Sequence, residues 1–227
     1  GCGVILPDEM GREARHQREI YDQKWENSRG KAGKGDPTEL ILTHRKTFKY
    51  LMNIPLADGD PVLDIGCGEG KVLNRLAGRR RIAGVGIDIS LAGIQSALSN
   101  NPFGHEYYIG HAEKLPFPDG HFSLIIALDV LEHLENPGRA IAEMHRCLKE
   151  KGHAFVHVPV ADNQWSLDWF YGKIYADRWR EILKEAGHKR SNMMKAGEIA
   201  AGFQNLGFRQ KKWERFNVWA QNYFDYH

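Results

Sequence analysis

The chain has 227 residues, of which 42% are hydrophobic and 26% charged, as is typical of a globular domain. Its 31 basic and 29 acidic residues nearly balance, so the basic excess that non-specific nucleic-acid binding requires is missing and no nucleic-acid partner is expected. Widely spaced cysteines (Cys2, Cys67 and Cys147) exclude a CxxC zinc pattern and indicate a reducing, cytoplasmic location. The longest apolar run, near residues 124–128, is far shorter than the ~20 residues of a membrane span.

The first 55 residues are predicted to form an N-terminal helical cap. Residues 8–35 are polar, with a weak helical pattern that ends in a Gly- and Lys-rich loop from Ser28 to Asp36. From Pro37 to Asn53 apolar residues recur at helical spacing, which predicts an amphipathic helix with Asp36 as its N-cap. The pattern leaves open whether residues 21–34 close over a ligand or form a disordered tail.

Alternating strands and helices follow in residues 56–160. Short apolar runs that end in Gly or Asp predict strands at 62–66, 82–89, 123–130 and 153–160. Helices are predicted between them at 71–76, 91–98 and 137–148. This alternation predicts an α/β fold with a parallel sheet and right-handed crossovers, so that helices cover both faces.

The remainder of the chain divides into two parts. Residues 161–195 are rich in Trp and Tyr and are predicted to form an insert on the substrate side of the sheet. Residues 196–227 are predicted to hold a C-terminal helix at 196–205 and strands that begin with 208–216. We expect all four parts to form one domain.

The segment VLDIGCGEG at residues 62–70 is the first candidate ligand site. Its glycines at 66, 68 and 70 permit a tight turn and a close approach of the backbone to a ligand. A dinucleotide-binding loop would carry a third glycine where this chain has Lys71. Glu69 at the start of the following helix would also repel a pyrophosphate, so a neutral or cationic ligand is favoured over a nicotinamide dinucleotide.

A second element, GVGIDIS, places Asp88 at the end of the next strand, about twenty residues after the glycine loop. A carboxylate at this position can accept hydrogen bonds from both hydroxyls of a ribose. The two elements together predict a nucleoside ligand without a diphosphate.

These segments, together with HAEKLPFPDGHFSLIIALDVLEHLENP and GHAFVHVPV, resemble the successive motifs of class I S-adenosylmethionine-dependent methyltransferases. They are most similar to the small-molecule branch that contains the ubiquinone and menaquinone biosynthesis methyltransferases. The resemblance covers residues 40–160, and EIAAGFQNLGF at 198–208 matches more loosely. It implies S-adenosylmethionine as cofactor, S-adenosylhomocysteine as product, and a three-layer Rossmann-like sandwich whose mostly parallel sheet has seven strands.

The resemblance also implies roles for single residues. Asp64 would orient the methionine amino group, Asp88 would bind the ribose, and Ile89 would pack on the adenine. The other cofactor contacts that it implies are the backbone of Gly66, Cys67 and Gly68, the adenine neighbours Ala112 and Glu113, and Leu128 and Asp129 beside the methyl group. The family usually has Asp where this chain has His111, and that Asp accepts a hydrogen bond from the adenine amino group, which an imidazole can do only through an unprotonated nitrogen.

Candidate catalytic and substrate-binding residues lie in later segments. His133, just after the strand at 123–130, is a candidate general base because an unperturbed histidine has a pKa near 6.5. A capping or packing role for His133 is an equal alternative, and His153 and His157 are expected to be structural. Trp165, Trp169 and His188 are candidate substrate-binding residues, although aromatic residues at helical spacing more often pack against a core.

The sequence therefore predicts an enzyme that transfers a methyl group to an O, N or C nucleophile of a small-molecule acceptor, mainly by positioning and desolvation. No NPPY-like segment follows the strand at 123–130, which speaks against methylation of a nucleobase amine. The alternatives are an RNA or protein methyltransferase, a non-catalytic cofactor-binding partner or sensor subunit, and a nicotinamide-dependent oxidoreductase. A monomer or homodimer is expected.

Overall fold

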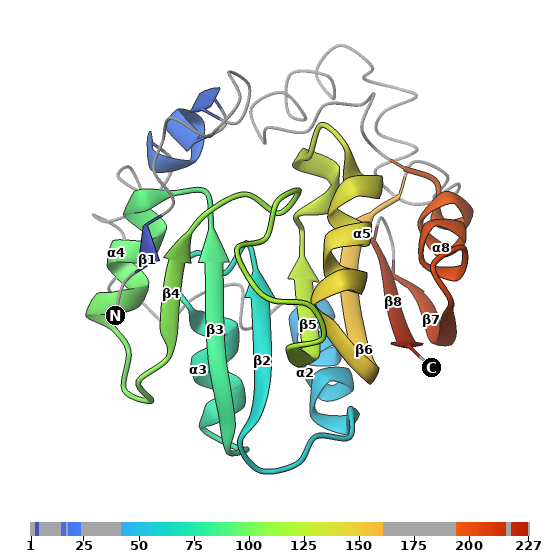
Figure 1. Ribbon diagram of the computed structural model, residues 1–227, viewed down its shortest axis with the longest axis horizontal. Helices are drawn as coiled ribbons and strands as arrows, with labels where there is room; N and C mark the ends of the chain where they lie inside the picture. Colours follow the sequence, from blue (N-terminus) through green and yellow to red (C-terminus); the bar gives the residue numbers. More distant parts are fainter. Residues whose placement is uncertain are drawn as a thin grey trace.

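The structure is a computed structural model that describes residues 3–4, 15–16, 18–23, 42–160, 194–216 and 219–226. Its strands are β1 (Gly3–Val4), β2 (Asp60–Ile65), β3 (Ile82–Asp88), β4 (Glu106–Ile109), β5 (Phe122–Leu128), β6 (Leu148–Pro159), β7 (Phe208–Phe216) and β8 (Trp219–Tyr226). They form one sheet in the order β1-β4-β3-β2-β5-β6-β8-β7 (Figure 1).

The strand directions place a switch point in the middle of this sheet. Neighbouring strands from β1 to β6 are parallel, whereas β8 runs antiparallel to both β6 and β7. The chain proceeds from β2 outward through β3 to β4, then crosses to β5 and proceeds outward in the opposite direction to β6. Ligands of open α/β sheets bind at the carboxyl ends of the strands beside such a point, which here lies between β2 and β5.

Helices cover both faces of the sheet, as Figure 1 shows. The helical elements are α2 (Leu42–Asn53), α3 (Lys71–Ala77), α4 (Leu91–Ser99), the 3-10 helix η3 (Leu131–His133), α5 (Pro137–Cys147) and α8 (Ala196–Gln204). One apolar core contains Leu51 of α2, Leu73 of α3 and Ile94 of α4. A second core contains Met144 of α5 and Phe203 of α8. The described residues thus form three layers.

Local sequence explains where these elements begin. The central strands β2 and β5 are buried on both faces, so they read as continuous apolar runs. The hydroxyl of Ser90 accepts a hydrogen bond from Gly93 N at 3.1 Å and caps α4. Asn136 Oδ1 accepts one from Arg139 N at 3.0 Å, and Pro137 takes the first position of α5.

Most predicted elements are found, with three differences. Leu148 begins β6 and does not end the preceding helix, because α5 passes into the strand without a loop. The resemblance implied seven strands, but the sheet has eight, because residues 3–4 pair with Tyr108 and Ile109. This pairing is made by the backbone, so no side-chain pattern predicts it. The short strand β4 was not placed from the sequence.

Parts of several predicted segments lie outside the described residues. These are most of the polar segment 8–35, the loop from Ser28 to Asp36, residues 37–41 of the first predicted helix, and nearly all of the aromatic segment 161–195 with Trp165, Trp169 and His188. Among the residues that the structure describes, no helix combines the length and apolar character that crossing a membrane would require.

Candidate functional site

The glycine loop connects β2 to α3 at the carboxyl edge of the sheet. Gly66, Gly68 and Gly70 have φ angles of 69°, 49° and 73°, in the left-handed region that favours glycine. The backbone N–H groups of Gly66 and Cys67 both donate to Ile87 O, at 2.8 and 3.2 Å. These bonds tie the loop to the end of β3, so the two motifs found in the sequence are joined directly.

Asp88 at the end of β3 holds the loop through its side chain. One carboxylate oxygen accepts a hydrogen bond from Gly68 N and the other accepts one from Ser90 N, each at 2.8 Å. Burial raises the pKa of Asp88, while the bonds from Ser90 and Gly68 lower it and the nearby Asp22 raises it. Each carboxylate oxygen has a further lone pair, so the side chain can still accept hydrogen bonds from a ligand.

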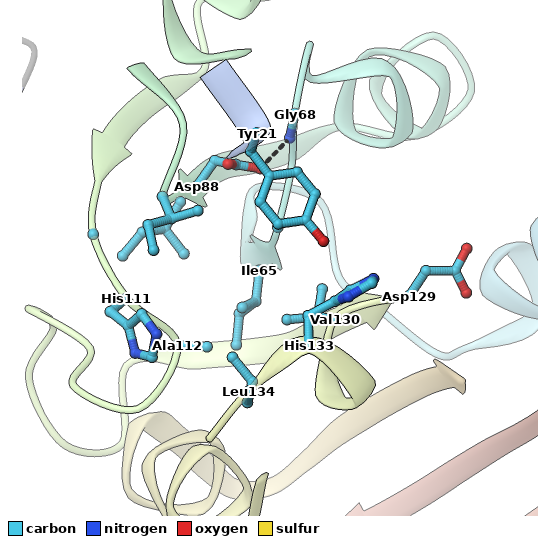
Figure 2. Close-up of a pocket in the computed structure, with 14 residues that line it drawn as sticks. Tyr21, Ile65, Gly68, Asp88, His111, Ala112, Asp129, Val130, His133 and Leu134 are labelled. Carbon is cyan, nitrogen blue, oxygen red and sulfur yellow. Dashed lines mark hydrogen bonds between the residues drawn. The ribbon is translucent and has the colours of Figure 1, made fainter. Parts of the chain in front are cut away.

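A cavity of about 160 Å³ opens beside these residues (Figure 2). Its lining comes from the ends of β2 and β3, from the segments that follow β4 and β5, and from the N-terminal helical residues 18–23. The lining residues are Tyr21, Ile65, Gly66, Gly68, Ile87, Asp88, Ile89, Gly110, His111, Ala112, Asp129, Val130, His133 and Leu134. Figure 2 shows His111 and Ala112 at one end of the cavity and Asp129 and His133 at the other.

Arg146 of α5 holds the segment that follows β4 in place. The guanidinium donates to the carbonyl oxygens of Phe117 at 2.7 Å and Leu115 at 2.9 Å, and it also bonds Asp119 and Glu143. Hydrogen bonds to Glu143 and Asp119 raise the pKa of Arg146 far above its usual range. Planar guanidinium groups suit such multiple contacts, so this clamp fixes the course of residues 115–119.

Asp129 links the ends of β5 and β6 at the other end of the cavity. Its φ is 57°, an uncommon angle for a residue other than glycine. Its Oδ1 lies 2.8 Å from His157 Nδ1, and its backbone N–H donates to His157 O at 2.9 Å. Backbone strain of this kind is found more often at functional sites than elsewhere.

His133 projects from η3 toward the same end. Its side chain is 14% exposed, and the ring of Tyr21 meets it edge-on with centroids 5.6 Å apart. Beneath it, Glu132 is 1% exposed, with Oε1 3.8 Å from His133 Nε2. Burial, assisted by Asp129, raises the pKa of Glu132 well above its ordinary value, which favours the neutral acid.

The structure brings together eight of the residues proposed from the sequence. Lining the cavity are Gly66, Gly68, Asp88, Ile89, His111, Ala112, Asp129 and His133. Four others do not line it: Asp64 is buried at 2% exposure, Cys67 packs in the core with Leu73, Leu128 packs against that core, and Glu113 accepts a hydrogen bond from Asn136 N at 3.0 Å. The roles that the resemblance implies for these four residues, through the backbone in the case of Cys67, therefore stay predictions.

Six lining residues were missed: Tyr21, Ile65, Ile87, Gly110, Val130 and Leu134. Ile65 ends β2 and Ile87 is the penultimate residue of β3, so the rule that ligands bind at carboxyl ends of strands could have found them. Tyr21 was not proposed as a site residue, although it begins the segment 21–34 for which closure over a ligand was left open, and the packing of the N-terminal helical residues brings it to the cavity.

The geometry defines a class of protein before any comparison is made. An open α/β sheet with a glycine loop, a ribose-compatible carboxylate and a cavity at its switch point is a nucleoside-binding domain. The acidic and aromatic character of the end formed by Asp129, His133 and Tyr21 fits a cationic group better than a phosphate.

Comparisons with known proteins identify the family. A family model described as a methyltransferase domain matches residues 39–211. The chain therefore belongs to this methyltransferase family, which confirms the resemblance to class I S-adenosylmethionine-dependent methyltransferases and their cofactor.

Curated relatives named as methyltransferases are similar to this chain at 28% identity. The chain is 28% identical to the 27-O-demethylrifamycin SV methyltransferase of Amycolatopsis mediterranei, over 64% of this chain and 56% of that protein. It is 28% identical to the demethylmenaquinone methyltransferase of Lactiplantibacillus plantarum, over 78% of this chain and 83% of that one. The chain spans about half the length of two of the curated relatives it matches, at 56% and 49%.

Among solved structures, a putative methyltransferase of Haloferax volcanii, in complex with the Trm112 methyltransferase activator, is similar with a TM-score of 0.71. It shares 18% identity over 92% of this chain and 97% of that one. The likeness confirms the Rossmann-like α/β fold.

Proposed function

We propose that the protein transfers a methyl group from S-adenosylmethionine to an O, N or C nucleophile of a small-molecule acceptor. The observation that carries this proposal is that the two ends of the cavity carry different side chains. Asp88 lies beside Gly68 of the glycine loop, while His111 lies at one end and Asp129 and His133 lie at the other (Figure 2). A cofactor whose ribose binds Asp88 would direct its adenine toward His111 and its sulfonium toward His133.

Roles for the lining residues follow from that orientation. Asp88 would accept the ribose hydroxyls, Ile89 and Ala112 would flank the adenine, and the backbone of Gly66 and Gly68 would lie against the amino-acid part. In this proposal Cys67, Glu113 and Leu128 support the backbone. Asp64, 2% exposed below the loop, keeps its role toward the methionine amino group as a hypothesis.

The chemistry needs little covalent help from the protein. The bond between sulfur and the methyl carbon breaks as the acceptor bonds to that carbon, and S-adenosylhomocysteine leaves. Positioning and exclusion of water carry most of the rate, since the sulfonium is already an activated leaving group. For hydroxyl acceptors, His133 would take the proton; its ring lines the cavity and is held by Tyr21.

A small-molecule acceptor is favoured by the names of the relatives, a rifamycin precursor and a demethylmenaquinone. Trp165, Trp169 and His188 remain our candidates for binding it. A second candidate is a macromolecular acceptor with an activating partner, because the Haloferax volcanii neighbour is bound to an activator. A cytoplasmic location and a monomeric or homodimeric state complete the proposal.

Calorimetric titration tests the proposal first. S-adenosylmethionine and S-adenosylhomocysteine are expected to bind in the micromolar range, and NADH is expected not to bind. Phenolic, quinol and carboxylate acceptors are then screened for methyl transfer, with and without S-adenosylhomocysteine as inhibitor. Failure of both sulfur nucleosides to bind would refute the assignment of this cavity.

A further inference from the structure

The imidazole of His111 is part of the turn that carries it. Its Nδ1 accepts a hydrogen bond from the backbone N–H of Glu113 at 3.3 Å, and its carbonyl oxygen accepts one from Lys114 N at 3.1 Å. The ring also lines the cavity, at the end opposite His133 (Figure 2). The ring therefore lines the cavity while its Nδ1 is engaged by the backbone, which leaves Nε2 as the nitrogen that a ligand would contact.

The bond from Glu113 fixes which nitrogen carries the proton. A nitrogen that accepts a hydrogen bond must be unprotonated, so the neutral ring carries its hydrogen on Nε2. Burial lowers the pKa of His111, and Arg139 adds to this effect, while Glu113 and Glu135 oppose it. The neutral form is thus favoured near pH 7, and Nε2 offers the cavity a donor and no acceptor.

A carboxylate at position 111 would behave differently. It has two acceptor oxygens, so one could accept from Glu113 N while the other accepted from a ligand amino group. Histidine also accepts from Glu113 N, through its Nδ1. Toward a ligand, however, its Nε2 is a donor where the carboxylate oxygen is an acceptor. The exocyclic amino group of adenine is a donor, whereas the neighbouring ring nitrogen N1 is an acceptor.

We propose that His111 reads the adenine by donating from Nε2 to the ring nitrogen N1, so that hydrogen-bond polarity at this end of the cavity is the reverse of that given by a carboxylate. This inference rests on the proposed orientation of the cofactor, with the adenine at the end of the cavity formed by His111 and Ala112. It makes His111 a specificity-determining residue that selects ligands by a ring acceptor and not by the 6-amino group.

Analogues of S-adenosylhomocysteine separate the two polarities. One analogue replaces N1 by carbon and keeps the amino group, and the other keeps N1 and lacks the amino group. The native chain is expected to bind the first about tenfold more weakly than S-adenosylhomocysteine and the second within about twofold, as one hydrogen bond is worth roughly that factor. His111→Asp is expected to reverse the order. His121→Asp, at an exposed histidine where β5 begins, is the matched control and should leave both ratios unchanged.

The outcomes are distinct. Equal affinity of the native chain for S-adenosylhomocysteine and the N1-lacking analogue would overturn the inference, as would an equal penalty in the native chain and His111→Asp, which would mean that another donor reads N1. If S-adenosylhomocysteine itself does not bind, the proposed function fails before this comparison is reached. If His111→Asp does not fold, the two analogues still test the inference on the native chain, and the ¹⁵N shifts of the native histidine ring report whether Nε2 carries the proton; a proton on Nδ1 would overturn the inference.

Discussion

Asp64→Asn is expected to stabilise the protein at neutral pH. The side chain is 2% exposed, and burial, with a smaller contribution from Asp88, raises its pKa from 3.8 to about 8. Its Oδ2 accepts no hydrogen bond from the described residues. Below pH 3.8 both folded and unfolded chains keep the proton; as the pH rises toward 8, the unfolded chain releases it while the folded chain retains it, so stability is lost over this range.

The expected size of the stabilisation follows from the pH range between the unfolded and folded pKa values of Asp64. One pKa unit corresponds to about 1.4 kcal/mol, so at pH 7, roughly three units above the unfolded pKa, the loss reaches about 4 kcal/mol. An asparagine does not titrate and escapes this loss. The free energy of unfolding of Asp64→Asn should therefore exceed that of the native chain by an amount that grows by about 1.4 kcal/mol per unit between pH 5 and pH 7 and levels off above pH 8.

Urea denaturation at pH 5, 6, 7 and 8, without ligand, measures this difference. Asp58→Asn is the control, because it makes the same chemical change at a side chain that is 76% exposed. A stability difference that stays constant from pH 5 to pH 8 would show that Asp64 is already ionised in the folded chain and would refute the reasoning. In the native chain, cofactor binding through an ionised Asp64 should also release a proton at pH 7, which calorimetry in two buffers detects.

Three further predictions concern the loop and the cavity. Gly70→Ala should destabilise the chain by about 2 kcal/mol or more in urea, since φ is 73° and a Cβ would meet the Tyr107 hydroxyl; Gly104→Ala, with φ 71° but open space, should cost only about 1 kcal/mol. Asp88→Ala should weaken S-adenosylhomocysteine binding about a hundredfold by calorimetry, and unchanged affinity would place the ribose elsewhere. His133→Ala should lower turnover on an identified hydroxyl acceptor about a hundredfold with little change in cofactor affinity, and equal turnover would exclude it as the base.

The sequence predicted best what depends on buried strands and glycine turns. β2 and β5 are buried on both faces, so their apolar runs were visible, and the left-handed turns at Gly66 and Gly70 require glycine. The sequence did not predict elements that are defined by backbone pairing alone, such as the two-residue β1, whose pairing with β4 leaves no side-chain pattern.

The candidate site shows the same division. Asp88 and Asp129 were found because sequence motifs mark them, but Ile65 and Ile87 near strand ends were missed, and Tyr21 is brought to the cavity by contacts with residues far away in the sequence. Asp22, its neighbour, accepts hydrogen bonds from Ser90 Oγ at 2.6 Å and Ala92 N at 3.0 Å, which attach the N-terminal helical residues to the start of α4. Such a contact between positions 68 residues apart cannot be read from local spacing.

The contacts of Arg146 hold the backbone close to the end of the cavity that is proposed to bind adenine. The guanidinium donates to the carbonyl oxygens of residues 115 and 117, and Glu143 accepts from Leu115 N at 2.8 Å, so these contacts do not involve the side chain at position 111. A substitution at position 111 removes the hydrogen bond from Glu113 N unless the new side chain can accept it, but it leaves the contacts of Arg146 and Glu143 in place. Selection can therefore act on the side chain at position 111 while the contacts of Arg146 continue to hold the neighbouring backbone.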